Sequence, residues 1–136
     1  MSNNATLAGH CFVDDGAIIG GLSAVHQFAR VGKHAFVGGM SGIAQDLPPW
    51  MLAVGNRALV QSPNIVGLRR AKAPQELVTA FKQAFRQVWH SGLPRPDALY
   101  QLEAEYGHLP EIMEFVAFIR QSERGILPAE DRKKDE

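Results

Sequence analysis

A strict six-residue repeat of aliphatic side chains runs through the first third of the chain. Its members stand six positions apart without a break: Leu7, Val13, Ile19, Val25, Val31, Val37 and Ile43. A small residue precedes each of them by two positions: Ala5, Cys11, Ala17, Ser23, Ala29, Ala35 and Ser41. Neither an α-helix nor a flat strand needs such a repeat. A triangular parallel β-solenoid does, because each flat face takes one hexapeptide with its aliphatic side chain in the interior.

Three hexapeptides make one coil, so residues 18 positions apart should stack on successive coils. The run supplies a little over two coils. The repeat is already in phase by Ala5, with no polar capping coil before it. A terminal coil needs a cap to cover its apolar end and its unpaired strand edges. The sequence therefore predicts that the chain begins inside a longer repeat array.

Four segments are predicted along the chain. Residues 1–50 form the coils, and Pro48 and Pro49 end the repeat because proline cannot donate a ladder hydrogen bond. Residues 51–73 form a non-repetitive connector, in which a strand fragment at 51–54 continues the coils. Residues 74–127 form three helices at about 74–92, 96–106 and 110–124, marked by apolar side chains at helical spacing. Residues 128–136 are expected to be a frayed, charged tail. The predicted fold is a left-handed parallel β-helix followed by a small all-α subdomain.

Composition excludes several classes of function. The formal net charge is zero, so no global field attracts nucleic acid or an anionic membrane. The single cysteine, Cys11, excludes an internal disulfide, fits a reducing cytoplasm and falls on a small inward position. No apolar run is long enough for a membrane span, and the first residues lack the features of a signal peptide. We expect a cytoplasmic protein without a cofactor.

Polar side chains that could carry chemistry gather on one side of the predicted solenoid. His10, His26 and Gln27 fall on outward or corner positions of adjacent coils. An imidazole there can act as a base, a hydrogen-bond donor or a ligand. Ordinary surface residues or histidines in subunit contacts would explain the pattern equally well. His34 is expected at a different corner, and the spacing supplies no three-histidine zinc set, so no metal site is predicted.

A second group of candidates lies in and around the connector. Arg57, Arg69 and Arg70 are the basic cluster near the end of the coils, and Asn64 stands in a turn between them. Guanidinium groups bind phosphate oxygens bidentately, so the group suits a diphosphate; a solvated surface pair is the alternative. The glycine pairs 20–21 and 38–39 occupy equivalent repeat positions and would leave room along the outer wall for an elongated apolar ligand. Simple turn geometry would explain them too.

Several longer motifs carry a family resemblance. They are Asn3-Asn4-Ala5-Thr6-Leu7-Ala8-Gly9-His10, Ala17-Ile18-Ile19-Gly20-Gly21, Val25-His26-Gln27-Phe28, Gln45-Asp46-Leu47-Pro48-Pro49 and Gly67-Leu68-Arg69-Arg70. Through them nearly the whole chain resembles the UDP-N-acetylglucosamine O-acyltransferase family of lipid A biosynthesis, in its C-terminal part. That family moves a 3-hydroxyacyl group from acyl carrier protein to the 3-hydroxyl of UDP-GlcNAc, in homotrimers with active sites between subunits.

The resemblance implies roles for individual residues. Gly9 matches the position whose backbone N–H stabilises the oxyanion. His10, His26 and Gln27 match positions that line the sugar and acyl site, and a neighbouring subunit's Asn64 and Arg70 match positions that hold the nucleotide diphosphate. Gly39 matches the floor of the acyl groove, where a small residue admits a longer acyl chain.

The sequence departs from the family pattern at a few positions. The family's catalytic histidine and its supporting aspartate have no counterpart in this sequence, so acyl transfer by this chain alone should be very slow or nil, since a positioned base contributes about 10²–10⁴-fold. Val66 and Ala71 replace a usual glutamate and arginine, which predicts a weaker grip on the nucleotide unless Arg69 compensates. Arg57 replaces a histidine that is common beside the acyl tail.

Two alternative functions stay open from the sequence. A trimerisation or ligand-binding module could keep the solenoid and lack the chemistry, and restored transfer after adding upstream coils would argue against it. A solenoid carbonic anhydrase would hold zinc, which elemental analysis would detect. An N-acyltransferase of the same pathway is disfavoured because the C-terminal part is predicted to be three short helices rather than one long one.

Overall fold

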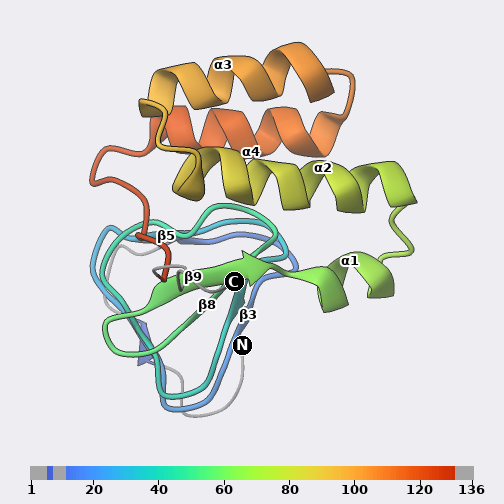
Figure 1. The fold of residues 1–136 in the computed structure, drawn as a ribbon. Helices are drawn as coiled ribbons and strands as arrows, with labels where there is room; N and C mark the ends of the chain where they lie inside the picture. Colours follow the sequence, from blue (N-terminus) through green and yellow to red (C-terminus); the bar gives the residue numbers. More distant parts are fainter. Residues whose placement is uncertain (1–5, 8–11, 131–136) are drawn as a thin grey trace, which may run out of the picture.

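The computed structural model describes the backbone of residues 6–7 and the whole of residues 12–130. The chain winds first into three-sided coils and then into helices that cover one side of them (Figure 1). Each face of a coil carries one short strand. These strands are β1 (Thr6–Leu7), β2 (Phe12–Val13), β3 (Ile18–Ile19), β4 (Ala24–Val25), β5 (Arg30–Val31), β6 (Phe36–Val37) and β7 (Gly42–Ile43).

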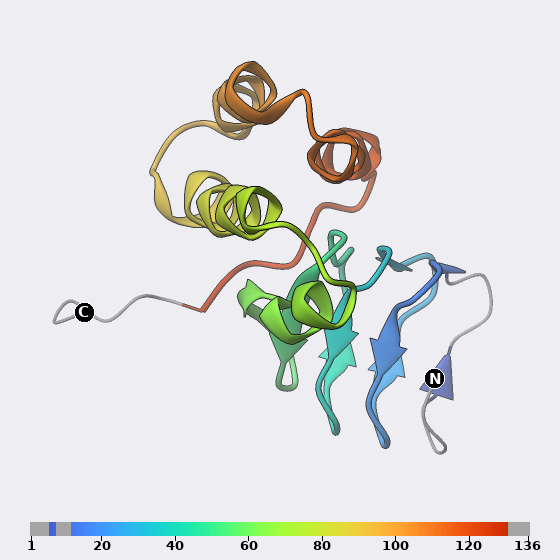
Figure 2. The ribbon, with the colours of Figure 1, turned by 90° about the vertical axis from the view of Figure 1, so that its right-hand side faces the viewer.

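The strands of successive coils form parallel sheets with the predicted 18-residue register. Ala24 lies opposite Gly42 in the sheet β1-β4-β7, and Ile18 lies opposite Phe36 in the sheet that contains β3 and β6. Strands β2 and β5 form the third sheet. Figure 2 shows the coils side by side, with the helices above them. The expectation of a parallel solenoid with hexapeptide faces is confirmed.

The interior is filled by the aliphatic residues of the repeat. The predicted inward residues from Ile19 to Ile43 are at most 1% exposed. The small positions serve a second purpose where they are serine. The Ser23 hydroxyl donates to Gly38 O at 2.8 Å and accepts from Ser41 N at 3.0 Å. Buried polar groups thus bond from one coil to the next, which satisfies them without water.

The corners between faces share one unusual backbone conformation. Gly16, Leu22, Phe28, His34 and Met40 follow one another at six-residue spacing, and all have φ between 56° and 75°. This left-handed region favours glycine and costs other residues roughly 1–2 kcal/mol. Only the first of the five is glycine, so the coil geometry, rather than local preference, fixes these corners. Their side chains point outward, and those of Leu22 and Met40 are 66% and 71% exposed.

The solenoid continues past the two prolines, contrary to the expectation that they end it. Strand β8 (Met51–Val54) pairs in parallel with β6, although Leu52 follows its partner Phe36 by 16 residues instead of 18. The prolines occupy the corner between two strands, where no ladder bond is required of them. The strand expected at 51–54 is confirmed, and β9 (Leu59–Pro63) returns antiparallel to it.

The connector is more ordered than predicted. It contains a helix, α1 (Ile65–Arg70), which the sequence analysis missed. Asn64 caps this helix, because its side-chain oxygen accepts from Gly67 N at 3.0 Å. The chain therefore has four α-helices among its described residues, where three were expected.

The three predicted helices are present. They are α2 (Gln75–Phe85), which continues into a π-helical turn η1 (Arg86–His90), α3 (Arg95–Tyr106) and α4 (Pro110–Gln121). Phe81 and Phe115 lie fully buried in contact between α2 and α4. Lys33 on a solenoid corner donates to Glu114 of α4 at 3.1 Å, and this bond raises the pKa of Lys33. No helix in the described part of the chain is long and apolar enough to span a membrane.

The segment Ser122–Glu130, here called the strap, returns from α4 to the coils between the helices and the solenoid (Figure 2). Val60 N donates to Pro128 O at 2.9 Å, and Glu130 N donates to Val60 O at 3.0 Å. The prediction of a frayed tail is therefore wrong for residues 128–130, because β9 offers them a strand edge. Residues 131–136 lie outside the described part.

A buried carboxylate joins the strap to the coils. Asp46 is 1% exposed, and its two carboxylate oxygens accept from Arg30 N at 2.8 Å and from Ser122 Oγ at 2.5 Å. Asp46→Ala leaves both donors without a partner, so we expect it to lower the free energy of unfolding by about 2 kcal/mol. Urea denaturation followed by tryptophan fluorescence measures the change.

Asp46→Asn is the matched control. It keeps one acceptor for the Arg30 amide, and the Ser122 hydroxyl can turn to accept from the new amide. We expect it to lose less than half as much stability as Asp46→Ala. Equal losses in the two variants would show that the charge of Asp46, rather than its hydrogen bonds, stabilises this junction.

Candidate functional site: a cavity between the solenoid and α1

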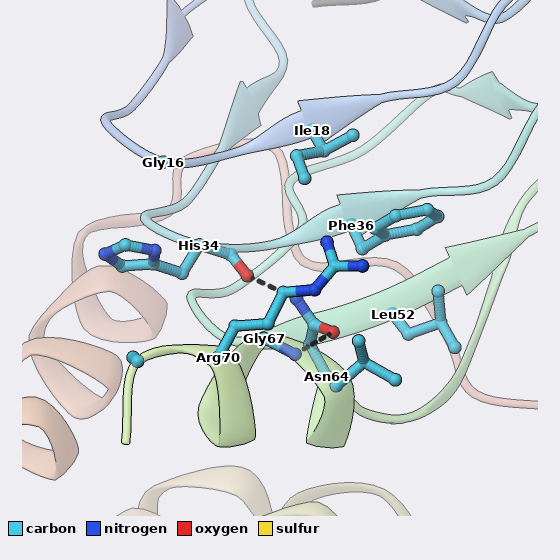
Figure 3. A pocket seen from close by; sticks show the side chains of 10 residues that line it. Gly16, Ile18, His34, Phe36, Leu52, Asn64, Gly67 and Arg70 are labelled. Carbon is cyan, nitrogen blue, oxygen red and sulfur yellow. Dashed lines mark hydrogen bonds between the residues drawn. The ribbon is translucent and has the colours of Figure 1, made fainter. Parts of the chain in front are cut away.

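A cavity of about 580 Å³ lies between one face of the solenoid and helix α1. Strands β3, β6 and β8 supply its apolar wall, because the residues next to the inward ones point outward from each strand. Figure 3 shows Ile18, Phe36 and Leu52 along this wall. The complete lining is Gly16, Ile18, His34, Phe36, Leu52, Asn64, Val66, Gly67, Arg70 and Ala71. The cavity is therefore mostly apolar, with polar groups gathered on the α1 side.

Arg70 is the one cation of this lining. Its side chain extends from the end of α1 across the cavity toward Ile18 and Phe36 (Figure 3). It forms no hydrogen bond or ion pair with any residue in the described part of the chain. A guanidinium group offers two parallel N–H donors that match a phosphate or carboxylate. The cavity is thus able to receive an anionic group at this end.

Asn64 is held by the fold on both sides. It is 8% exposed, its Nδ2 donates to His34 O at 2.8 Å, and its Oδ1 accepts from Gly67 N at 3.0 Å. The first bond ties α1 to a solenoid corner, and the second caps the helix. One amide hydrogen and one oxygen lone pair remain for other partners. The structure gives Asn64 a part in positioning α1, and with it Arg70.

The two adjacent arginines of α1 differ in position. Both are exposed, but only Arg70 lines the cavity, whereas Arg69 does not. Val66 and Ala71, the positions at which the sequence departs from the family pattern, also line it. The two departures therefore change the cavity itself, which loses a carboxylate and a guanidinium that the family pattern would place there.

His34 is a lining residue that the sequence analysis did not select. Its ring stacks on the Trp50 indole with the ring centroids 4.2 Å apart. A Cβ atom at Gly16, one coil below, would collide with the same imidazole ring. Gly16 and His34 are 18 residues apart, so the repeat spacing was the signal that could have placed His34 in this stack.

The remaining predicted site residues lie at other edges of the solenoid. His26 and Gln27 are exposed between β4 and β5, at a different corner from His34 as predicted. Gly39 lies at the corner between β6 and β7. Gly9 and His10 lie outside the described residues, as does the predicted clustering of His10 with His26.

Arg57 lies near the Gly39 corner. It stands in the turn between β8 and β9, and this turn is bonded to the segment that follows Gly39, through Gly55 N to Ser41 Oγ at 3.0 Å. The structure thus brings Asn64 together with Arg70, and Gly39 near the turn of Arg57. It keeps His26 and Gln27 apart from both pairs within one chain.

No metal-binding cluster is found in the part of the chain that the structure describes. No three His, Cys, Asp or Glu side chains there are placed to hold one ion. These residues give the carbonic anhydrase alternative no support.

Known proteins resemble this chain over most of its length. The family model for UDP-N-acetylglucosamine O-acyltransferase, domain 2, matches residues 46–127. The acyl-[acyl-carrier-protein]–UDP-N-acetylglucosamine O-acyltransferase of Anaeromyxobacter dehalogenans (strain 2CP-1) is 44% identical over 126 residues, which cover 93% of this chain and 49% of that protein.

Solved structures agree with the sequence match. LpxA from Acinetobacter baumannii superposes with a TM-score of 0.88 at 34% identity, over 92% of this chain and 49% of its own. The UDP-N-acetylglucosamine acyltransferase from Campylobacter jejuni gives 0.86 at 35% identity, over 95% and 50%. The chain spans about half the length of the relatives it matches. The match includes the coils, the cavity and the helices, and the chain therefore belongs to the UDP-N-acetylglucosamine O-acyltransferase family.

Proposed function

We propose that this chain forms the nucleotide-holding part of an acyl-[acyl-carrier-protein]–UDP-GlcNAc O-acyltransferase, which acts in the first step of lipid A biosynthesis in the cytoplasm. In that reaction the 3-hydroxyl of UDP-GlcNAc attacks the thioester carbonyl of a 3-hydroxyacyl group on acyl carrier protein. A C–O bond forms, the C–S bond breaks, and the hydroxyl proton passes by way of a base to the departing thiol. The names of the relatives support these substrates.

The observation that carries the proposal is Arg70 in its cavity. An exposed guanidinium without an ion-pair partner among the described residues faces an apolar wall, next to the helix cap of Asn64. The cavity volume of about 580 Å³ lies within the range of small-ligand sites. A nucleotide diphosphate has the charge for Arg70 and enough apolar surface for the wall.

Three copies of the chain are proposed to form the functional unit. His26 and Gln27 lie at a different corner from Asn64 and Arg70 within one chain, so a shared site needs a neighbouring subunit. Exposed apolar side chains such as Leu22 and Met40 would be covered in such an assembly. The left-handed sense of the coils is part of the same proposal and is supported by the likeness to solved acyltransferases.

The proposed acyl groove runs past Gly39 and Arg57. Gly39 is exposed, and an added Cβ there would meet only Gly21 O, at 3.4 Å. The open space beside it favours a longer hydroxyacyl donor. Acyl carrier protein and UDP-GlcNAc are the proposed partners, with no cofactor, nucleic acid or membrane insertion.

Calorimetric titration with UDP-3-O-(3-hydroxyacyl)-GlcNAc tests the proposal. Binding is the right measurement because the family's general base has no counterpart in this sequence. We expect micromolar affinity for the unmodified chain. Arg70→Ala should weaken it roughly 10–100-fold, because a charge-assisted pair contributes about 1.5–3 kcal/mol.

Arg69→Ala is the matched control, since it removes the neighbouring arginine that does not line the cavity. Its affinity should stay within about threefold of the unmodified chain. Equal losses for the two arginines would contradict the assignment of Arg70. No binding by an intact trimer, as judged by light scattering, would contradict the proposed function of this chain.

A further inference from the structure

Neighbouring coils are joined by a hydrogen bond at two edges of the solenoid. His34 N donates to Asp15 O at 3.1 Å, and Met40 N donates to Gly21 O at 2.9 Å. In both cases the donor follows the acceptor by 19 residues. These bonds hold each corner against the corner of the next coil.

The third edge breaks this rule. The same spacing would pair Asp46 N with Gln27 O. Instead, Asp46 N donates to Gly125 O at 3.0 Å, and Gln27 O accepts from Arg124 Nη1 at 2.6 Å. Two residues of the strap thus stand between the coils and take both ends of the missing bond.

The strap is fixed in this place by further contacts. Gln45 Nε2 donates to Arg124 O at 3.2 Å, and Leu127 N donates to Asp46 O at 2.8 Å. Gly125 has φ +89°, and a Cβ atom there would lie 3.1 Å from Gln45 Nε2. Position 125 therefore strongly favours glycine, and the carbonyl of Arg124 is held on the coil that follows Gln27.

We propose that Arg124 is a positioning residue for the corner that carries His26 and Gln27. The guanidinium supplies a charged donor in place of the missing inter-coil amide, and charged donors make stronger bonds than neutral ones. Phe28, next in this corner, has φ +68°, a conformation that needs the surrounding structure to hold it. Loss of Arg124 therefore releases the corner. For ligand binding the inference rests on the function proposed above for His26 and Gln27; the coupling of strap and corner does not.

Hydrogen exchange of the purified full chain, without ligand, tests this coupling. In Arg124→Ala we expect the amides of residues 27–29 to exchange at least about tenfold faster, while those of β3 and β6 keep their rates. Arg124→Lys retains one charged donor and should give an intermediate rate. Arg120→Ala is the matched control: it removes another exposed arginine of the same region, bonded to Glu103, and should leave the corner unchanged.

Titration of the same variants with UDP-3-O-(3-hydroxyacyl)-GlcNAc supplies the second measurement. We expect affinity about tenfold weaker in Arg124→Ala and nearly unchanged in Arg120→Ala. Unchanged exchange at 27–29 in Arg124→Ala would overturn the inference even if affinity fell, because Arg124 would then act on the ligand directly. Faster exchange with full affinity would overturn the role in binding. If the unmodified chain binds nothing, the proposed function fails, and the exchange rates alone decide the coupling. Should Arg124→Ala not fold, Arg124→Lys decides: rates equal to the unmodified chain's uphold the charged donor and faster rates at 27–29 with affinity retained contradict it.

Discussion

Replacing Trp50 with alanine is expected to lower the free energy of unfolding by about 4 kcal/mol, as for other buried aromatic truncations. Trp50 is 7% exposed and stacks on His34 of the preceding coil at 4.2 Å, with 18° between the rings. On the other side its ring lies 6.1 Å from that of Phe81 in α2. The indole therefore joins the coils to the helical layer. Urea denaturation followed by circular dichroism measures the loss without relying on tryptophan emission.

Trp50→Phe serves as the control, because a smaller ring keeps part of the stack and should lose less than half as much stability. A further consequence concerns cooperativity. With the joint removed, the solenoid and the helices should unfold in transitions that no longer coincide, as followed at Trp89 and in the far ultraviolet. A loss below about 1 kcal/mol in Trp50→Ala would contradict the role of Trp50 as the joint.

The repeat allowed the coils to be predicted in detail. Inward residues, small neighbours and an 18-residue register all follow from one spacing, because each coil repeats the same backbone geometry. The corners could not be predicted in the same way. Leu22, Phe28 and Met40 adopt a left-handed conformation that their side chains disfavour, and only the closure of the coil explains it.

The parts that sequence analysis missed depend on contacts between distant segments. Helix α1 is six residues long, too short for a periodic signal, and its clearest mark was the cap residue Asn64. The strap has no strand pattern of its own; it is ordered because β9 and Asp46 offer backbone partners. Two prolines suggested the end of the solenoid, but proline excludes a ladder donor only at its own position.

The candidate site was predicted in its residue types but not in its assembly. Asn64 and Arg70 were selected, and the structure places both at one cavity. The separation of Arg70 from Arg69 needed the helix, and His34 needed its stack with Trp50. Arg124 was missed because its partner is a backbone carbonyl 97 residues away, which no side-chain pattern records.

The glycines stacked at the second edge are expected to respond differently to the same substitution. A Cβ atom at Gly20 would lie 2.5 Å from Gly39 N and 2.7 Å from Gly39 Cα, and neither backbone atom can move without opening the coils. We expect Gly20→Ala to lower the free energy of unfolding by about 3 kcal/mol, at the upper end for overpacking. At Gly39 the added methyl meets only Gly21 O at 3.4 Å, an ordinary contact. Gly39→Ala should therefore change stability by less than about 0.5 kcal/mol.

The pair separates the structural use of glycine from its proposed use in the acyl groove. Urea denaturation of both variants gives the stability, and titration with ligands of two acyl lengths gives the groove. Gly39→Ala should weaken binding of the longer acyl chain more than that of the shorter one, while the fold is unchanged. Equal destabilisation by both substitutions would mean that both glycines are required by the close approach of the coils. Chain length could then not be set at Gly39 independently of folding, because any larger side chain there would open the solenoid before it shortened the groove.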